Sequence, residues 1–180
     1  MNELRLYKVL SKYVEALRNK DNGGDETAYR VDKDKENRPF VGIITFCNGR
    51  NYFIPLTTPR ERIKYLTAKE PDYTPIYRKG QLLAGIEFNK MIPVPLNQVR
   101  ELDIESREHD SRSNRWEKER RRYEIVWCNK HAEEIVRKAE MLYRMRINND
   151  PSYKNIAYCL NFPALEAICD EYEKNHPKQH

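Results

Sequence analysis

The chain has 180 residues, and its 33 lysines and arginines against 28 aspartates and glutamates give a formal net charge of +5. This length is too short for two domains of ordinary size, so we expect a single domain over residues 1–180. The small basic surplus is compatible with a nucleic-acid partner without demonstrating one, because the local field decides binding. No apolar run approaches the roughly 18 residues that span a bilayer, the N-terminus opens with charged residues, and the four cysteines contain no C-x-x-C pair. We expect no membrane segment, no zinc site and no disulfide framework, and hence a reduced, cytoplasmic protein.

The first predicted elements are a strand and a helix. Residues 4–9 alternate in character, and Ser11 is followed by apolar residues at helical spacing, which predicts a short strand and then a helix that ends by Asn22-Gly23-Gly24. Residues 25–37 are polar, with acidic and basic side chains alternating and no apolar face. This stretch predicts an exposed loop.

Strands dominate the next part of the chain. Residues 40–46 and 52–56 are apolar runs separated by Asn48-Gly49, which is the strongest short-range signal of a β-hairpin because both residues tolerate the left-handed backbone of a tight turn. Further strand candidates are residues 82–88, 91–94 and 99–104, and two prolines place the middle one at an edge or a bend.

The last part is predicted to be helical. Residues 106–122 are highly charged and form either a mobile insertion or the solvent-facing start of a helix. From Tyr123 the apolar residues recur at helical steps, which predicts a long amphipathic helix that stops before Asn148, and Pro163 suits the start of a final helix. Strands followed by helices indicate an α+β fold, in which an antiparallel sheet or small barrel is flanked by helices over about residues 115–175.

One candidate phosphate site lies where the second hairpin strand ends. Thr58 is a natural helix N-cap and Pro59 a natural first helical residue. A helix start there would offer amide donors and a positive dipole to a phosphate, together with the hydroxyl of Thr57 or Thr58 and the guanidinium of Arg60. The competing interpretation is simple capping, with Arg60 on the surface.

A second set of candidates lies in the polar loop. Metal-free RNA cleavage needs groups that take the 2′-hydroxyl proton, stabilise the phosphoryl charge and protonate the departing oxygen. Tyr29 offers an acid or base, and an electrostatic clamp is offered by Lys33, Lys35 and Arg38. The alternative is that Tyr29 is a packing or surface residue.

The four histidines show no ligand spacing, which argues against a two-histidine ribonuclease site. His131 falls between Trp127 and Ile135 on the apolar stripe, so we expect a hydrogen-bonded core residue rather than a catalyst. The acidic residues near Lys33 alternate with lysines, which is typical of a solvated loop. We therefore expect no metal and no cofactor.

Aromatic and basic residues interleave in the predicted long helix. Trp116 and Trp127 lie on either side of Arg120 and Arg121, and such a mixture can stack on bases while it contacts phosphates. A core stripe with a charged outer face explains the same pattern. Both interpretations stay open.

Four blocks in the first hundred residues, taken in order, resemble the ToxN/AbiQ family. They begin at Leu6, Asn37, Ile54 and Asn89 and read LYKVLSKYV, NRPFVGI, IPLTTPR and NKMIPV. Residues 159–165 look similar too. Ordered blocks are far more specific than any one of them.

The resemblance implies a compact, twisted antiparallel β core with surrounding helices, related to the Kid and MazF toxin fold. It implies an endoribonuclease toxin of a type III toxin–antitoxin system that needs no metal, uses the RNA 2′-hydroxyl as nucleophile and leaves a 2′,3′-cyclic phosphate. It also implies an antitoxin RNA of tandem pseudoknot repeats, which the enzyme processes and which then inhibits it, often in a cyclic protein–RNA assembly. Cellular or phage RNA would be the substrate, in phage abortive infection.

By this resemblance the catalytic tyrosine of the family falls on Tyr29 and its basic residue on Arg38, with Lys35 as a competing candidate. The family's Thr-Ser-Pro-Lys segment falls on residues 57–60, where two residues depart from the pattern. Thr58 keeps a hydroxyl but adds a methyl, and Arg60 keeps the charge but cannot give up a proton, which leaves it a phosphate clamp. The aromatic residue that lines the family's groove falls on Trp127.

Two other functions fit the same residues. A non-catalytic RNA-binding protein would use the same basic and aromatic groups and leave RNA intact. An interaction domain would dimerise through the long helix.

Overall fold

The computed structural model describes residues 3–19, 38–45 and 49–177 of the chain. Its strands are β1 (Arg5–Val9), β2 (Phe40–Thr45), β3 (Asn51–Thr57), β4 (Tyr73–Arg78), β5 (Gln81–Glu87), β6 (Ile92–Pro93) and β7 (Val99–Glu101). Its α-helices are α1 (Ser11–Asn19), α2 (Arg112–Lys130), α3 (Ala132–Ile147) and α4 (Phe162–Asn175). Short 3-10 turns are η2 (Glu61–Ile63), η3 (Phe88–Lys90), η4 (Leu96–Gln98) and η5 (Ile156–Tyr158).

The strands form one antiparallel sheet in the order β4-β5-β3-β2-β1-β7, with β6 paired to β3. β3 joins its two parts, because Tyr52 and Phe53 pair with β6 while Leu56 and Thr57 pair with β5. The sheet is open, which is consistent with a partial barrel. The α+β fold predicted from the order of elements is therefore confirmed.

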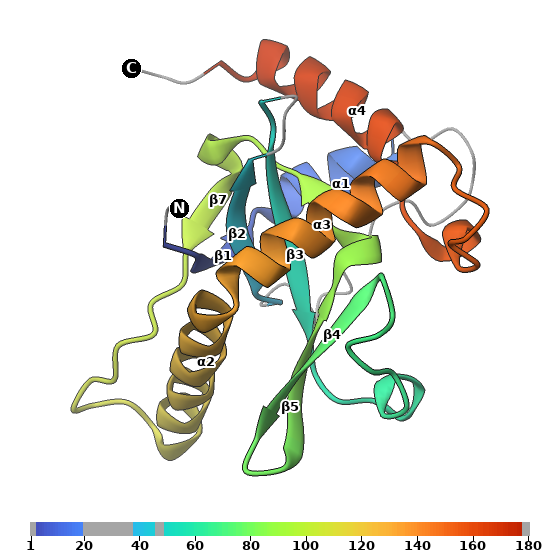
Figure 1. Cartoon of the computed structure of the whole chain (residues 1–180). Helices are drawn as coiled ribbons and strands as arrows, with labels where there is room; N and C mark the ends of the chain where they lie inside the picture. The colour runs from blue at the N-terminus through green and yellow to red at the C-terminus, as the bar shows by residue number, and fades with distance from the viewer. Residues whose placement is uncertain (1–2, 20–37, 46–48, 178–180) are drawn as a thin grey trace.

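One buried hydrophobic cluster extends from Leu4 to Cys169 and joins the sheet to the helices. The helical spacing identifies its helix residues correctly, among them Tyr13, Val14 and Leu17 of α1 and Ile135, Ala139 and Leu142 of α3. Figure 1 shows α3 crossing the sheet in front of β3, α4 above it, and the β4–β5 hairpin projecting below with α2 beside it. The end of β3 therefore lies where this hairpin joins the sheet.

The predicted hairpin of β2 and β3 is confirmed. Phe40 pairs with Pro55 and Thr45 with Asn51. Gly49 has a φ of +75°, the left-handed conformation that the turn signal predicts. Asn48 lies outside the described residues, as does residue 46, the last of the predicted first strand.

Sequence reasoning missed β4. Its pairing with β5 makes a second hairpin, in which Lys79 and Gly80 both have positive φ values, 50° and 78°. Pro75 lies in the middle of β4 and argues against a strand, but β4 is at the edge of the sheet, where a missing amide donor is tolerated. The predicted strands near residues 82–88, 91–94 and 99–104 are present as β5, β6 and β7.

Within the charged stretch of residues 106–122, the part from Arg112 onward is the start of a helix, as the second of the two interpretations expects. The Ser111 hydroxyl caps α2 by accepting from the Asn114 amide at 3.1 Å. The single long helix we expected is wrong, because the chain breaks between α2 and α3 at His131. His131 is half-buried rather than in the core, and its Nδ1 lies 2.8 Å from the Trp127 carbonyl oxygen.

The three described cysteines, Cys128, Cys159 and Cys169, are free and buried. Burial raises the pKa of the Cys159 thiol to about 12 and that of Cys169 to about 11, so they behave as small apolar side chains. Within the described residues, no helix is both long and apolar enough to cross a bilayer.

Candidate active site

The candidate site begins at the last residue of β3. Thr57 pairs with Gly85 of β5 and is only 5% exposed, and its hydroxyl donates weakly to the Thr58 carbonyl at 3.4 Å. The next three residues, Thr58, Pro59 and Arg60, are all exposed. The hydroxyl that the sequence points to is therefore held at a strand end beside an exposed segment.

The helix start expected at Thr58 and Pro59 is wrong. The N-cap position is taken by Arg60, which has extended dihedrals (φ −135°, ψ 160°) and makes no side-chain capping bond, and the following η2 has only three residues. Because the turn begins after Arg60, Pro59 precedes it instead of opening it. One 3-10 turn carries too little aligned backbone to provide the amide donors and dipole that we expected.

Arg38 lies directly beside this strand end. Its Nε donates to the carbonyl oxygen of Leu56 at 3.0 Å, and its guanidinium forms an ion pair with the carboxylate of Glu87. Both side chains are largely buried, with 12% and 8% of their surface exposed. The pair holds the Arg38 guanidinium in place next to Thr57.

Tyr73 approaches the same point from β4. It is 1% exposed, and its hydroxyl has no hydrogen-bond partner among the residues that the structure describes. The ring lies over Gly85, where an added Cβ would be 2.3–2.6 Å from three of its outer atoms. Burial, together with the nearby Glu87 carboxylate, raises the pKa of Tyr73 to about 12, so the phenol remains a hydrogen-bond donor at neutral pH.

These side chains form what we call the β3-end cluster: Arg38, Thr57, Tyr73 and Glu87. It offers a cation, a hydroxyl, a phenol and a carboxylate from four segments of the chain. Sequence reasoning missed Tyr73 and Glu87. A glycine inside an apolar strand pattern signals close approach, and Gly85 was the available hint.

A cavity of about 430 Å³ adjoins the cluster. Tyr73 and Glu87 line this cavity and are also members of the β3-end cluster. Its other lining residues are Ile63, Leu66, Asp72, Asn89, Lys90, Asn155 and Tyr158. This volume falls within the usual range of ligand sites.

Comparison with known proteins identifies the family. A family model described as the toxin ToxN of type III toxin–antitoxin systems matches residues 5–170. The chain belongs to this family. The resemblance seen in the ordered sequence blocks is thus confirmed.

Two relatives align with nearly the whole length of this toxin. Endoribonuclease ToxN of Bacillus thuringiensis subsp. kurstaki is 27% identical over 94% of this chain and 84% of the relative. Endoribonuclease AbiQ of Lactococcus lactis subsp. lactis is 23% identical over 95% of this chain and 90% of the relative.

Solved structures show that the fold is shared. The lactococcal anti-phage endoribonuclease AbiQ superposes with a TM-score of 0.79 at 22% identity, covering 96% of this chain and 99% of AbiQ. A bacterial type III toxin that a non-coding RNA pseudoknot selectively inhibits superposes with a TM-score of 0.77 at 21% identity, again covering 96% and 99%. At these identities the likeness establishes the architecture of the toxin.

The helix residues that we expected to contact RNA lie in different environments. Trp116 is 61% exposed, with the Arg120 guanidinium 5.9 Å from its ring centroid. Arg120 and Arg121 both bind the fully buried carboxylate of Glu124 at 2.9 Å, and Arg120 also donates to a β5 carbonyl. Trp127 is half-buried and stacks on His131, with the ring centroids 3.9 Å apart. In this toxin both arginines bond within α2 and Arg120 also ties α2 to the β4–β5 hairpin, while Trp116 faces solvent.

The loop candidates Tyr29, Lys33 and Lys35 lie outside the described residues. The structure therefore brings together Arg38 and Thr57 of the predicted site, with Thr58 and Arg60 next along the chain. Trp116, Arg120, Arg121 and Trp127 all lie on α2 instead, in the different environments described above.

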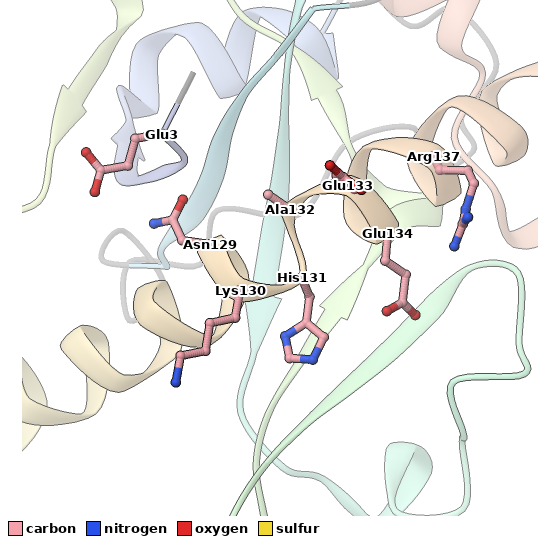
Figure 2. Close-up of a pocket in the computed structure, with 8 residues that line it drawn as sticks. All are labelled: Glu3, Asn129, Lys130, His131, Ala132, Glu133, Glu134 and Arg137. Atoms are coloured by element: carbon pink, nitrogen blue, oxygen red, sulfur yellow. The ribbon is translucent and has the colours of Figure 1, made fainter. Parts of the chain in front are cut away.

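A second hollow, of about 490 Å³, lies at the junction of α2 and α3. Figure 2 shows the side chains of Lys130, His131 and Glu134 leaving the junction on the same side. Its lining mixes both signs of charge, so it favours neither an anion nor a cation. In the described part of the toxin, no three His, Cys, Asp or Glu side chains gather as metal ligands.

Proposed function

We propose that this toxin is an endoribonuclease that cuts RNA at the β3-end cluster. The observation that carries the proposal is that the Arg38 guanidinium bonds the carbonyl of Leu56, the residue directly before Thr57. A fixed cation and a hydroxyl at one strand end can hold a single phosphodiester. The sequence relatives of this toxin are named endoribonucleases, which supports the same reaction.

In the proposed reaction a base takes the proton of the RNA 2′-hydroxyl, the 2′-oxygen attacks the adjacent phosphorus, and the bond to the 5′-oxygen breaks as that oxygen takes a proton from an acid, which leaves a 2′,3′-cyclic phosphate and a 5′-hydroxyl. Arg38 offsets the charge that develops on the phosphoryl oxygens, and Glu87 fixes its guanidinium. The Thr57 hydroxyl donates to a phosphoryl oxygen. Thr58 and Arg60 are exposed just beyond, where Arg60 binds the neighbouring phosphate as a cation.

We retain Tyr29 as the proposed acid or base, with Lys35 or Arg38 as its basic neighbour. Proton transfer by such groups needs no metal ion. Trp116 on α2 provides an exposed aromatic surface on which a base can stack. Lys33, Arg120, Arg121 and Trp127 complete the proposed RNA-binding residues.

We also propose that the toxin acts in the cytoplasm and is inhibited by an antitoxin RNA of repeated pseudoknots in a cyclic protein–RNA assembly. The structurally similar toxin inhibited by a non-coding RNA pseudoknot supports this partner. The anti-phage activity of AbiQ supports a role against phage. Cellular or phage RNA would be cut when the antitoxin is scarce.

The test is to incubate purified toxin with RNA in EDTA and to sequence the new RNA ends. We expect cutting to persist, with 3′ ends that accept an adaptor only after the cyclic phosphate is removed. Loss of cutting on chelation and its return on adding metal would contradict the mechanism. Binding without new ends would favour the non-catalytic RNA-binding protein.

Variants test the site itself. Thr57→Val removes the hydroxyl while preserving shape and should slow cutting by about 100-fold or more, and Thr58→Ala should slow it less. Thr67→Val is the matched control, because Thr67 is exposed and its hydroxyl accepts only from the Lys69 amide. Full activity of Thr57→Val, with an unchanged unfolding midpoint, would exclude Thr57 from the site.

A further inference from the structure

The cavity beside the β3-end cluster has a polar group built into its wall. The hydroxyl of Tyr73 is buried, and within the described residues it has no hydrogen-bond partner. A buried donor without an acceptor costs stability, and such groups persist where a ligand supplies the acceptor. Tyr73 lines the cavity and also belongs to the β3-end cluster, where its hydroxyl lies over Gly85, so an RNA bound across both lies against this residue.

The walls of the cavity combine apolar and polar surfaces. Ile63 and Leu66 provide apolar contact, while Asn89 and Asn155 carry amides that both donate and accept hydrogen bonds. A nucleobase needs the same combination, because its faces are apolar and its edge carries donors and acceptors.

An exposed aromatic ring, that of Tyr158, lines this cavity. Tyr158 lines it and is 72% exposed, and Tyr65, which is 84% exposed, lies between the lining residues Ile63 and Leu66 in the chain. Large exposed tyrosines are the side chains on which unpaired bases stack. The lining carries both signs of charge, with Lys90 against Asp72 and Glu87, so it suits an uncharged base rather than a phosphate.

The cavity lies next to the cluster at which we propose that RNA is cut. It shares Tyr73 and Glu87 with the β3-end cluster, and Glu87 holds the guanidinium of Arg38. The cavity therefore adjoins the point at which Arg38 and Thr57 would hold the phosphate.

We propose that this cavity receives one unpaired nucleobase next to the bond that is cut and thereby sets part of the sequence preference of cleavage. Tyr73 donates to the base or its sugar, the amides of Asn89 and Asn155 read the base edge, and Tyr158 stacks on its face. The inference rests on the proposed ribonuclease function and assigns a specificity pocket to it.

The test uses RNAs built around a cleavage site mapped by end sequencing, each with an abasic nucleotide at one position near the cut. For the unmodified toxin, kcat/KM should fall by about 10-fold or more at one position. Tyr158→Ala and Asn155→Ala change exposed residues. In each variant kcat/KM for the intact RNA should fall by most of this factor, whereas kcat/KM for the abasic RNA should change little. Tyr73→Phe should also reduce the discrimination, which is the ratio of kcat/KM for intact RNA to kcat/KM for abasic RNA.

Tyr172→Phe is the matched control, because it removes a phenol that bonds Gln98 and lines neither the cavity nor the cluster. It should keep the full discrimination. If the toxin cuts RNA but every variant discriminates as the unmodified protein does, the pocket is overturned and the ribonuclease stands. If the toxin cuts no RNA, the proposed function fails, and equal binding of intact and abasic RNAs would then overturn the pocket as well.

Discussion

Gly85 is the residue whose replacement tests the packing of the β3-end cluster most directly. In Gly85→Ala the new Cβ would lie 2.3 Å from Cε2, 2.4 Å from Oη and 2.6 Å from Cζ of Tyr73, against about 3.4 Å or more for ordinary contact. Tyr73 is buried, so its ring must either strain or swing toward the cavity. Overpacking of this kind costs about 1–3 kcal/mol of unfolding free energy. For a chain of this size that lowers Tm by roughly 2–12 °C.

Thermal unfolding of four proteins separates this clash from other effects. They are the unmodified toxin, Gly85→Ala, Tyr73→Leu and the double variant. Leucine lacks the outer ring atoms that meet the new Cβ, so Gly85→Ala should cost little stability in the Tyr73→Leu background. Cleavage by Gly85→Ala should also fall, by about 10-fold, because the phenol is displaced. An equal loss of stability in both backgrounds would refute the reasoning.

Two further predictions concern ion pairs away from the cavity. Glu124→Gln removes a fully buried charge that both Arg120 and Arg121 bind. It should lower the free energy of unfolding, measured by urea titration, by about 3–5 kcal/mol. Glu117 is exposed, so the control Glu117→Gln should unfold like the unmodified toxin. The Arg50 guanidinium bonds the Asp170 carboxylate and lowers its pKa in the folded protein. The charged carboxylate therefore stabilises the fold at pH values above its pKa in the unfolded chain, and this stabilisation is lost as the pH falls through its lower pKa in the folded protein. Asp170→Asn should therefore cost stability at neutral pH and progressively less as the pH falls below the ordinary pKa of an aspartate, and a cost that does not change with pH would exclude this linkage.

Elements with a local signal could be predicted from the sequence. The hairpin of β2 and β3 depends on Asn48-Gly49 and its flanking apolar runs, and the helices α1 and α4 depend on apolar spacing within a few turns. β4 could not be predicted in this way, because Pro75 is acceptable only at a sheet edge and the edge is a property of the whole sheet.

The break between α2 and α3 could not be predicted from the apolar periodicity either. Trp127, His131 and Ile135 follow one another at four-residue steps, so the apolar period continues straight through the break. At the break His131 leaves the helical conformation (φ −114°, ψ 21°), and its side chain lies close to the Trp127 carbonyl oxygen and stacks on the Trp127 ring. Periodicity does not report such a contact.

Half of the β3-end cluster was accessible from the sequence. Thr57 and Arg38 were named from their motif positions, and the structure brings them together at the end of β3. Tyr73 and Glu87 reach the same point only because β5 pairs with β3 at Thr57 and Gly85. Local spacing carries no information on that register. The roles of all these residues in cleavage stay predictions.

The placement of the two tryptophans makes α2 a built-in optical reporter. Trp116 projects into solvent near the start of the helix, whereas Trp127 is packed against an imidazole near its end. These are the two indoles of the chain, so a Trp127→Phe protein would emit from the solvent-facing ring alone. Its fluorescence would then follow RNA docking on that part of α2 without any attached dye.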